Sequence, residues 1–316
     1  MKNSKTLIIL AFIAIYFIWG STYLFNKIAV TELPPFFLAS IRFFVASILM
    51  SGLALLSKQK LAISKKQLSN SVIAAFFFMV YGNGVFVWAL KFVDSGFGAL
   101  LASTQPLFVL FLLRLIDRKP FQKKSLIGVA LGMIGMYLLV SQVELRTSEG
   151  SLLGIFMILT CVLSWSYGSV FVSKADLPKS FMVSTGYQML AASFILFIVS
   201  ISLNEQWSSP LTWSTNVQIS MLILIVFGGI FAFTAFNYLL KVVSPEKVST
   251  SAYVNPVIAL FMGWYFLDEV LSTQSVIASV VLLTGVYFIT SRKKILNLNF
   301  KLSIFKYDFV PQLNWF

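Results

Sequence analysis

The chain has 316 residues, of which 58% are apolar and 11% are charged. Because soluble domains carry roughly 25% charged residues, this composition excludes an ordinary soluble fold and indicates a chain surrounded mostly by lipid. The formal net charge of +13 would suit a nucleic-acid binder, but the basic residues stand at the ends of apolar runs, so we expect no nucleic-acid partner.

Several kinds of chemistry lack the residues they need. The chain contains one cysteine, Cys161, and no histidine, which excludes an intrachain disulfide, a redox pair and the commonest metal ligands and general base. No Walker sequence, HExxH motif or GxSxG nucleophile elbow occurs. We therefore expect no enzyme activity, no cofactor and no metal site.

Ten apolar runs are long enough to cross a bilayer, which takes about 20 residues. The first resembles a signal sequence after Lys2 and Lys5, but it is too long for one and lacks a clear cleavage site, so we interpret it as a retained span. The predicted spans are residues 6–27, 36–56, 69–91, 96–114, 121–141, 151–173, 180–202, 216–240, 247–267 and 272–291.

The distribution of Lys and Arg predicts the orientation. With the N-terminus inside, 20 of the 24 basic residues fall on inner segments and 3 on outer loops, and the remaining one, Arg42, lies inside a span. This asymmetry follows the positive-inside rule. We expect both termini in the cytoplasm.

The chain contains its own sequence twice. Residues 86–141 align without a gap onto residues 236–291 at an offset of 150, and the first two spans align at an offset of 146, which pairs Trp19 with Trp165. Each copy has five spans, so the second copy must enter the membrane from the opposite side. The predicted fold is therefore an all-α membrane protein of ten helices in two inverted repeats, residues 1–145 and 146–291, followed by a cytoplasmic basic and aromatic tail, residues 292–316. We expect the tail to lie at the lipid interface or to be disordered.

Prolines divide the fourth and ninth spans near their middles. Pro106 follows Gln105, and Pro256 follows Tyr253 and Asn255. Because proline removes one helical hydrogen bond, we predict hinges at Pro106 and Pro256, with freed carbonyls and polar side chains facing a cavity. The alternative is that the amides only satisfy the kinks.

Arg42 and Gln188 occupy equivalent places in the second and seventh spans. A charge inside a membrane is costly, so Arg42 should face a wet interior or a partner, where it could hold a carboxylate or a phosphate. The equally weighted alternative is that Arg42 extends to the surface or pairs with carbonyl oxygens.

Aromatic and amide side chains at helical spacing complete the candidate substrate site, although each taken alone is more often a packing residue. These further candidates are Trp19, Tyr23, Asn26, Tyr81, Asn83, Trp165 and Asn237. All eleven acidic residues lie in loops, span ends or the tail, so a proton relay deep in the membrane has no obvious carrier.

Three stretches carry a family resemblance. Residues Phe17-Ile18-Trp19-Gly20-Ser21-Thr22, Ala39-Ser40-Ile41-Arg42-Phe43-Phe44 and Phe266-Leu267-Asp268-Glu269, in this order within two repeats, resemble the EamA type of the drug/metabolite transporter superfamily over about residues 7–291. The resemblance implies a ten-helix carrier of the bacterial cytoplasmic membrane, with a central cavity between the halves. The family's acidic ending of the fourth span is altered here to Asp117-Arg118-Lys119.

The leading hypothesis is a secondary transporter that moves a small amphipathic metabolite, an amino acid or a related compound, by alternating access and in the direction of efflux. Its partners would be the substrate and membrane lipids, with a homodimer left open. The alternative is a non-transporting membrane component, a lipid-handling or receptor-like subunit, built on the same helix bundle. A sealed apolar interior would favour that alternative, and a hydrated polar cavity would favour the carrier.

Overall fold

The structure, a computed structural model, describes residues 5–89, 92, 101–118, 120, 122–141, 151–267 and 272–291. These residues form helices and no strands. Seven of the helical segments are long and apolar enough to span a membrane: Lys5–Asn26, Pro35–Leu56, Lys65–Ala89, Leu152–Lys174, Phe181–Ser202, Thr215–Val242 and Thr273–Thr290. An all-helical membrane fold is confirmed, and the count of ten spans stays a prediction. The tail and Asp268-Glu269 lie outside the described residues.

The helices of the first repeat are α1 (Lys5–Ile13), η1 (Ala14–Ile18), α2 (Trp19–Ala29), α3 (Pro35–Leu56), α4 (Lys65–Ala75), η2 (Phe76–Val85), α5 (Phe86–Ala89), α7 (Gln105–Asp117) and α8 (Lys123–Val140). The second repeat contains α9 (Ser151–Lys174), α10 (Phe181–Ser202), the short 3-10 turn η3 (Pro210–Thr212), α11 (Thr215–Ile223), η4 (Leu224–Phe233), α12 (Thr234–Val242), α13 (Pro245–Val248), α14 (Ser251–Leu267) and α15 (Thr273–Thr290). The elements η1, η2 and η4 are π-helical.

Local sequence explains where several helices begin and end. Ser64 and Gln67 form a reciprocal capping box at the start of α4. At the ends of α3 and α10, Lys58 and Asn204 adopt left-handed backbone conformations with φ of 55° and 53°. Each is followed by an amide that bonds back to the last helical turn, Gln59 to Ala54 and Glu205 to Ser200. Since Lys58 and Asn204 differ by the repeat offset of 146, the two copies end this helix in the same way.

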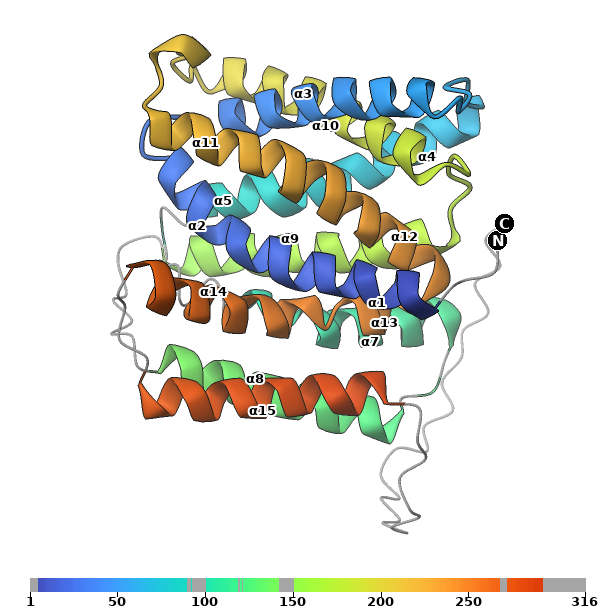
Figure 1. The fold of residues 1–316 in the computed structure, drawn as a ribbon. Coiled ribbons are helices and arrows are strands. Elements are labelled where there is room, and N and C mark those ends of the chain that lie inside the picture. Colours follow the sequence, from blue (N-terminus) through green and yellow to red (C-terminus); the bar gives the residue numbers. More distant parts are fainter. Residues whose placement is uncertain are drawn as a thin grey trace.

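Equivalent helices of the two repeats pack against each other at opposite edges of the bundle. In Figure 1, α3 and α10 form one edge and the pair of α8 and α15 forms the other, with the remaining helices between them. Ser40 bonds to the Ser193 carbonyl while Gly186 faces Ser47 and Met50, so α3 and α10 run antiparallel. Antiparallel packing of equivalent helices is the arrangement expected of inverted repeats.

Glycines let α8 and α15 approach closely. A Cβ atom at Gly128 would lie 2.7 Å from the Gly285 carbonyl oxygen, and one at Gly285 would lie 2.7 Å from the Gly128 carbonyl oxygen. Four residues after Gly128, Gly132 faces the ring of Tyr253. This spacing of small residues is a common way for membrane helices to bring their backbones together.

The third helix of each repeat contains a π-helical segment near its middle. In the first repeat it is η2, and in the second it is η4, and these lie at equivalent positions of the duplicated sequence. A π-turn widens the helix and frees a carbonyl oxygen, which needs another donor in the absence of water. Ser164 donates to Phe77 O at 2.9 Å in η2, and Trp19 donates to Gly228 O at 3.3 Å in η4.

The two predicted hinges differ in local structure. Before Pro106 the chain leaves the helix at Ser103 and Thr104, and α7 starts again at Gln105, so Pro106 lies in a first turn, where its missing N–H costs no helical bond. Pro256 lies inside α14, which follows a similar break at Ser249 and Thr250. The chain thus leaves the helix just before Pro106, so that Pro106 begins a helix and does not kink one.

Candidate functional site

Five aromatic rings meet at the centre of the bundle. Trp19 packs edge-on against Trp165 with ring centroids 5.8 Å apart, and the ring of Phe236 lies 5.0 Å from Trp19. Phe78 and Phe233 complete the cluster, and both are buried. These side chains come from η2, α2, η4, α12 and α9, so the cluster joins both repeats. The sequence predicts that Trp19 and Trp165 line a cavity, whereas in this conformation the rings pack against each other.

Arg42 is held by two amide oxygens of other helices. Its Nη1 donates to Asn26 Oδ1 at 3.1 Å and its Nη2 donates to Asn83 Oδ1 at 3.0 Å. The guanidinium carbon lies 4.5 Å from the ring centroid of Phe43, and the residue is 8% exposed. The predicted residues Asn26, Arg42 and Asn83 therefore form one group, which we call the arginine node. Both of its acceptors are neutral side-chain amide oxygens.

Gln188 belongs to a matching neutral group in the second repeat. The Gln188 amide donates to Ser184 Oγ at 3.1 Å, and its oxygen accepts from Asn237 Nδ2 at 3.3 Å. Asn237 also donates to Thr185 Oγ1 at 3.1 Å, while its own Oδ1 is buried without a partner. We call these four residues the glutamine node.

The two nodes lie at nearly the same depth. The contact of Ser40 with Ser193, together with that of Gly186 with Ser47, places Arg42 about three residues from the level of Gln188. At 1.5 Å of rise per residue, this is about 5 Å along the axis. Both nodes therefore lie at a similar level of the antiparallel helices α3 and α10.

Asn255 binds the π-helical part of the first helix. With its amide nitrogen on the side of the acceptors, it donates to the carbonyl oxygens of Ile15, Tyr16 and Ser251 at 3.1–3.3 Å. Nearby, the hydroxyls of Tyr16 and Thr250 are 2.7 Å apart. The start of α14 is thus joined to η1 of the other repeat through the amide before Pro256.

The remaining predicted residues belong to neither node nor to the aromatic cluster. Tyr81 donates its hydroxyl to Thr160 at 3.1 Å, and its backbone oxygen accepts from the thiol of Cys161. The Gln105 carbonyl accepts from Ser166 at 3.4 Å. Tyr253 is fully buried against α8, away from the nodes, with its hydroxyl 3.5 Å from Val129 O. The side chain of Tyr23 lies outside the described residues.

A carboxylate that is not among the predicted site residues joins the repeats at one end of the bundle. Glu205, just after α10, accepts from the amides of Phe36 and Phe37 at 3.2 and 2.7 Å, at the first turn of α3. The positive end of a helix dipole favours such a carboxylate. A carboxylate of the first repeat makes the corresponding contact with the second: Glu32 accepts a hydrogen bond at 3.0 Å from the amide of Ser214, the N-cap of α11. We call these contacts the glutamate clasp.

One sequence feature points to the glutamate clasp, namely the length and composition of the loop that contains Glu205. Glu205 lies in the loop of residues 203–215, which the sequence marks as longer than its counterpart and as the outer segment with Pro, Ser and Trp. Hydrogen bonds from the side chain and the backbone amide of Ser214 lower the pKa of Glu32. Both carboxylates therefore act as acceptors for helix starts, a role that needs no acid inside the membrane.

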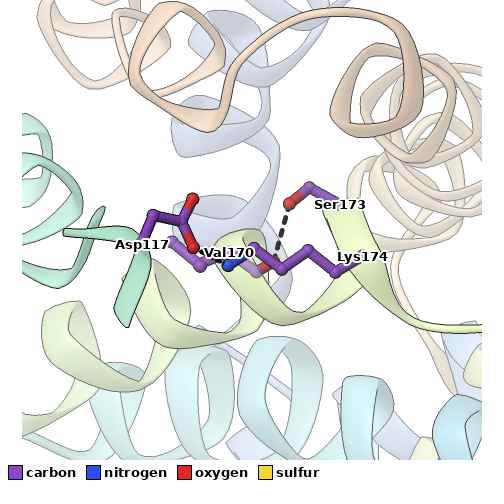
Figure 2. A network of polar contacts seen from close by, with 4 residues as sticks. All are labelled: Asp117, Val170, Ser173 and Lys174. Atoms are coloured by element: carbon purple, nitrogen blue, oxygen red, sulfur yellow. Dashed lines mark hydrogen bonds and ion pairs between the residues drawn. The ribbon is translucent and has the colours of Figure 1, made fainter. Parts of the chain in front are cut away.

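At the opposite end of the bundle, the repeats are joined by an ion pair. Figure 2 shows Lys174 Nζ against Asp117 Oδ1, with Ser173 donating to Val170 O one turn earlier. Lys174 ends α9 just before α10 begins, while Glu205 follows the end of α10, so the two contacts lie at opposite ends. Eight residues after Asp117, Ser125 donates a hydrogen bond to Glu246. The end of the fourth span differs from the family pattern, but its carboxylate, Asp117, still forms a contact, the ion pair with Lys174.

Two hollows on the described part of the chain lie at its margins. One, of about 310 Å³, is lined by Ile201, Asn204, Glu205, Gln206 and Trp207. The other, of about 90 Å³, is lined by Ser51, Leu61, Val183, Gly186, Tyr187 and Leu190. Neither is lined by a residue of the two nodes.

Comparison with known proteins agrees with the duplicated helical architecture. The sequence profile of the EamA-like transporter family matches twice, at residues 6–141 and 152–291. The chain belongs to the EamA-like transporter family. Its duplicated sequence is therefore a pair of EamA domains, and the superfamily resemblance is confirmed.

Relatives and a solved structure extend the comparison. The chain is 35% identical to the "Uncharacterized inner membrane transporter YedA" of Escherichia coli K12, over 90% of each chain. It is 24% identical to the "Uncharacterized transporter YoaV" of Bacillus subtilis, over 91% of this chain and 99% of the relative. A crystal structure at 16% identity matches 91% of this chain and 97% of that chain with a TM-score of 0.77. The last match supports the fold alone.

Proposed function

We propose that this protein is a secondary transporter that moves a small amphipathic metabolite, an amino acid or a related compound, out of the cell by alternating access. It is a multi-pass protein of the bacterial inner membrane, the location that the name of YedA states for that relative. In this proposal ten spans form two inverted repeats with both termini in the cytoplasm. The partners are the transported molecule and membrane lipids, and a homodimer is compatible with it.

The observation that carries the proposal is the pair of polar nodes at repeat-equivalent positions. Arg42 and Gln188 are buried at nearly the same depth beside the aromatic cluster, in a bundle whose two repeats meet there. Polar groups are costly in the interior of a membrane bundle, and they commonly mark a substrate path. In this proposal, the glutamate clasp and the pair of Asp117 with Lys174 are the contacts that close the two ends of the bundle.

The second candidate, a non-transporting membrane component, gains support from the aromatic cluster. Phe78 and Phe236 are at most 1% exposed and pack with Trp165 where a cavity was expected. A permanently sealed bundle would carry out no alternating access. The two candidates differ in one measurable property, the flux of solutes through the protein.

Flux through proteoliposomes of defined lipid composition separates the two candidates. Purified protein is reconstituted, and the movement of a broad metabolite panel, including all common amino acids, is followed by mass spectrometry against protein-free vesicles. We expect faster flux of one compound class. A panel in which no compound moves faster than in empty vesicles would reject the transporter and favour the non-transporting component.

A further inference from the structure

The arginine node holds a positive charge without a negative partner. Arg42 forms no ion pair among the described residues, and its two hydrogen bonds go to the neutral oxygens of Asn26 and Asn83. Its third nitrogen, Nε, is buried with no hydrogen-bond partner. A buried guanidinium without a counter-charge is costly, and an unpaired N–H adds to this cost. The node is therefore incomplete without an anion.

The unpaired nitrogen defines the edge at which an anion fits. In a guanidinium, the Nε–H and one N–H of Nη2 point to the same side and match the two oxygens of a carboxylate. Here Nε is empty and Nη2 holds Asn83, while Asn26 is bound at Nη1 on the other side. A carboxylate at this edge would fill the empty position, replace Asn83 and leave Asn26 bound.

We propose that Arg42 binds the carboxylate of the transported molecule through Nε and Nη2, and that Asn83 occupies part of this site when no substrate is bound. The proposal rests on the transporter function and specifies its substrate class as a monocarboxylate. One guanidinium is balanced by one carboxylate charge, whereas a phosphate monoester with nearly two charges would leave an excess in an apolar site. Among the described side chains, Arg42 is the only buried Lys or Arg.

Replacement of Asn83 also changes how the helices are held. Asn83 lies on η2, and its bond to Arg42 connects this π-helical segment to α3. In the same segment, Gly84 packs against Phe36 of α3 and Leu196 of α10. When a carboxylate takes the place of Asn83, this polar connection between η2 and α3 is lost. Substrate binding thereby releases η2 from this contact within the first repeat.

The two asparagines give a matched pair of variants with opposite expectations. Asn83→Ala removes a competitor of the carboxylate, so carboxylates should bind roughly 3- to 10-fold more tightly, the equivalent of one net hydrogen bond. Asn26→Ala removes a bond that persists in the bound state, so binding should not tighten. Arg42→Gln should abolish the preference for carboxylates over their amides.

The probes are compounds that differ only in the anionic group: phenylacetate against phenylacetamide, and L-phenylalanine and L-leucine against their amides. Binding is measured by thermal stabilisation of the purified protein in detergent, and flux is measured in proteoliposomes. We expect at least one carboxylate to stabilise the wild type more than its amide does. Asn83→Ala should increase that difference, and Asn26→Ala should not.

Other results would overturn the assignment. If no carboxylate is preferred over its amide, or if Asn83→Ala weakens carboxylate binding, Arg42 is not the carboxylate site. When neutral or cationic compounds still move through the protein in either case, the transporter function stands and only the substrate class is wrong. Absence of flux for the whole metabolite panel rejects the function itself. If Arg42→Gln does not fold, the comparison of the two asparagine variants decides alone.

Discussion

Ser164 shows how single side chains make π-helical segments tolerable in this bundle. Its hydroxyl donates to Phe77 O at 2.9 Å, and it is 9% exposed. Ser164→Ala leaves that carbonyl without this donor in an environment that has no water, so the protein should lose about 0.6 kcal/mol of unfolding free energy, the average for hydrogen bonds between membrane helices. Unfolding by SDS titration in mixed micelles measures the change.

The control for this prediction is Ser202→Ala. The Ser202 hydroxyl bonds to Ile198 O of its own helix and is exposed, so its removal should leave the unfolding free energy unchanged. Equal stability of the Ser164 and Ser202 variants would show that the freed carbonyl of η2 has no need of its donor.

Residue spacing in the sequence identifies part of the candidate site. Trp19 and Asn26 share a face of the first helix, and the structure places them in the aromatic cluster and the arginine node. The bond between Arg42 and Asn83 joins residues 41 positions apart on different helices, and periodicity carries no information about such a pairing. The side chains that donate to the freed carbonyl oxygens of η2 and η4 could not be predicted either, because no local sequence pattern indicates a π-turn.

The pair of α8 and α15 depends on the absence of side chains at its contact. In Gly128→Ala, the new Cβ would lie 2.7 Å from Gly285 O and 2.6 Å from a side-chain carbon of Ile289. The backbone atom cannot rotate away, so the two helices must separate. We expect a loss of about 1–3 kcal/mol in the free energy of unfolding, typical of overpacking. The same SDS titration measures it.

Gly52→Ala is the matched control on another helix. A Cβ atom at Gly52 in α3 would have no neighbour within 4 Å, so alanine should be neutral or should stabilise the protein by about 0.5–1 kcal/mol through its better helix propensity. A Gly128 variant that is as stable as the Gly52 variant would contradict the close packing of α8 and α15.

Helix limits follow the sequence where a cap or a charge marks them. The predicted span of residues 36–56 and that of residues 180–202 agree within one residue with α3 and α10, which begin after turns and end at left-handed residues. The fourth span is less well predicted, since Pro106 allows either a kink or a new helix start. The break at Ser103 and Thr104 selects the second, and this depends on packing beyond the local sequence.

At the scale of the whole molecule, polar contacts join the two repeats at both ends of the bundle. Glu205 binds the first turn of α3 at one end, and Lys174 pairs with Asp117 at the other. Alternating access requires that one end opens while the other stays closed. Charge-assisted bonds from two amides should hold more firmly than a partly exposed ion pair. The end with Glu205 is therefore expected to open less readily.

The chain's own cysteine can report this opening. Cys161 of α9 is 1% exposed, and its thiol donates to Tyr81 O of the other repeat at 3.3 Å, so it lies between the repeats. Glu205→Gln should raise its reaction with a membrane-impermeant maleimide added from the side of Glu205. A loss of about 1 kcal/mol in the clasp corresponds to a roughly fivefold larger open population. Asp117→Asn should raise labelling from the opposite side, by a smaller factor.

Labelling in intact cells is compared with labelling in inside-out vesicles, and Cys161→Ala sets the background. The opposite sidedness of the two variants is the decisive feature, because general loosening of the bundle would expose the thiol to both sides at once. If both variants increase labelling from the same side, or from both sides equally, the end contacts are not alternating gates. If each variant exposes Cys161 to its own side alone, the repeats separate at one end at a time, as a carrier requires.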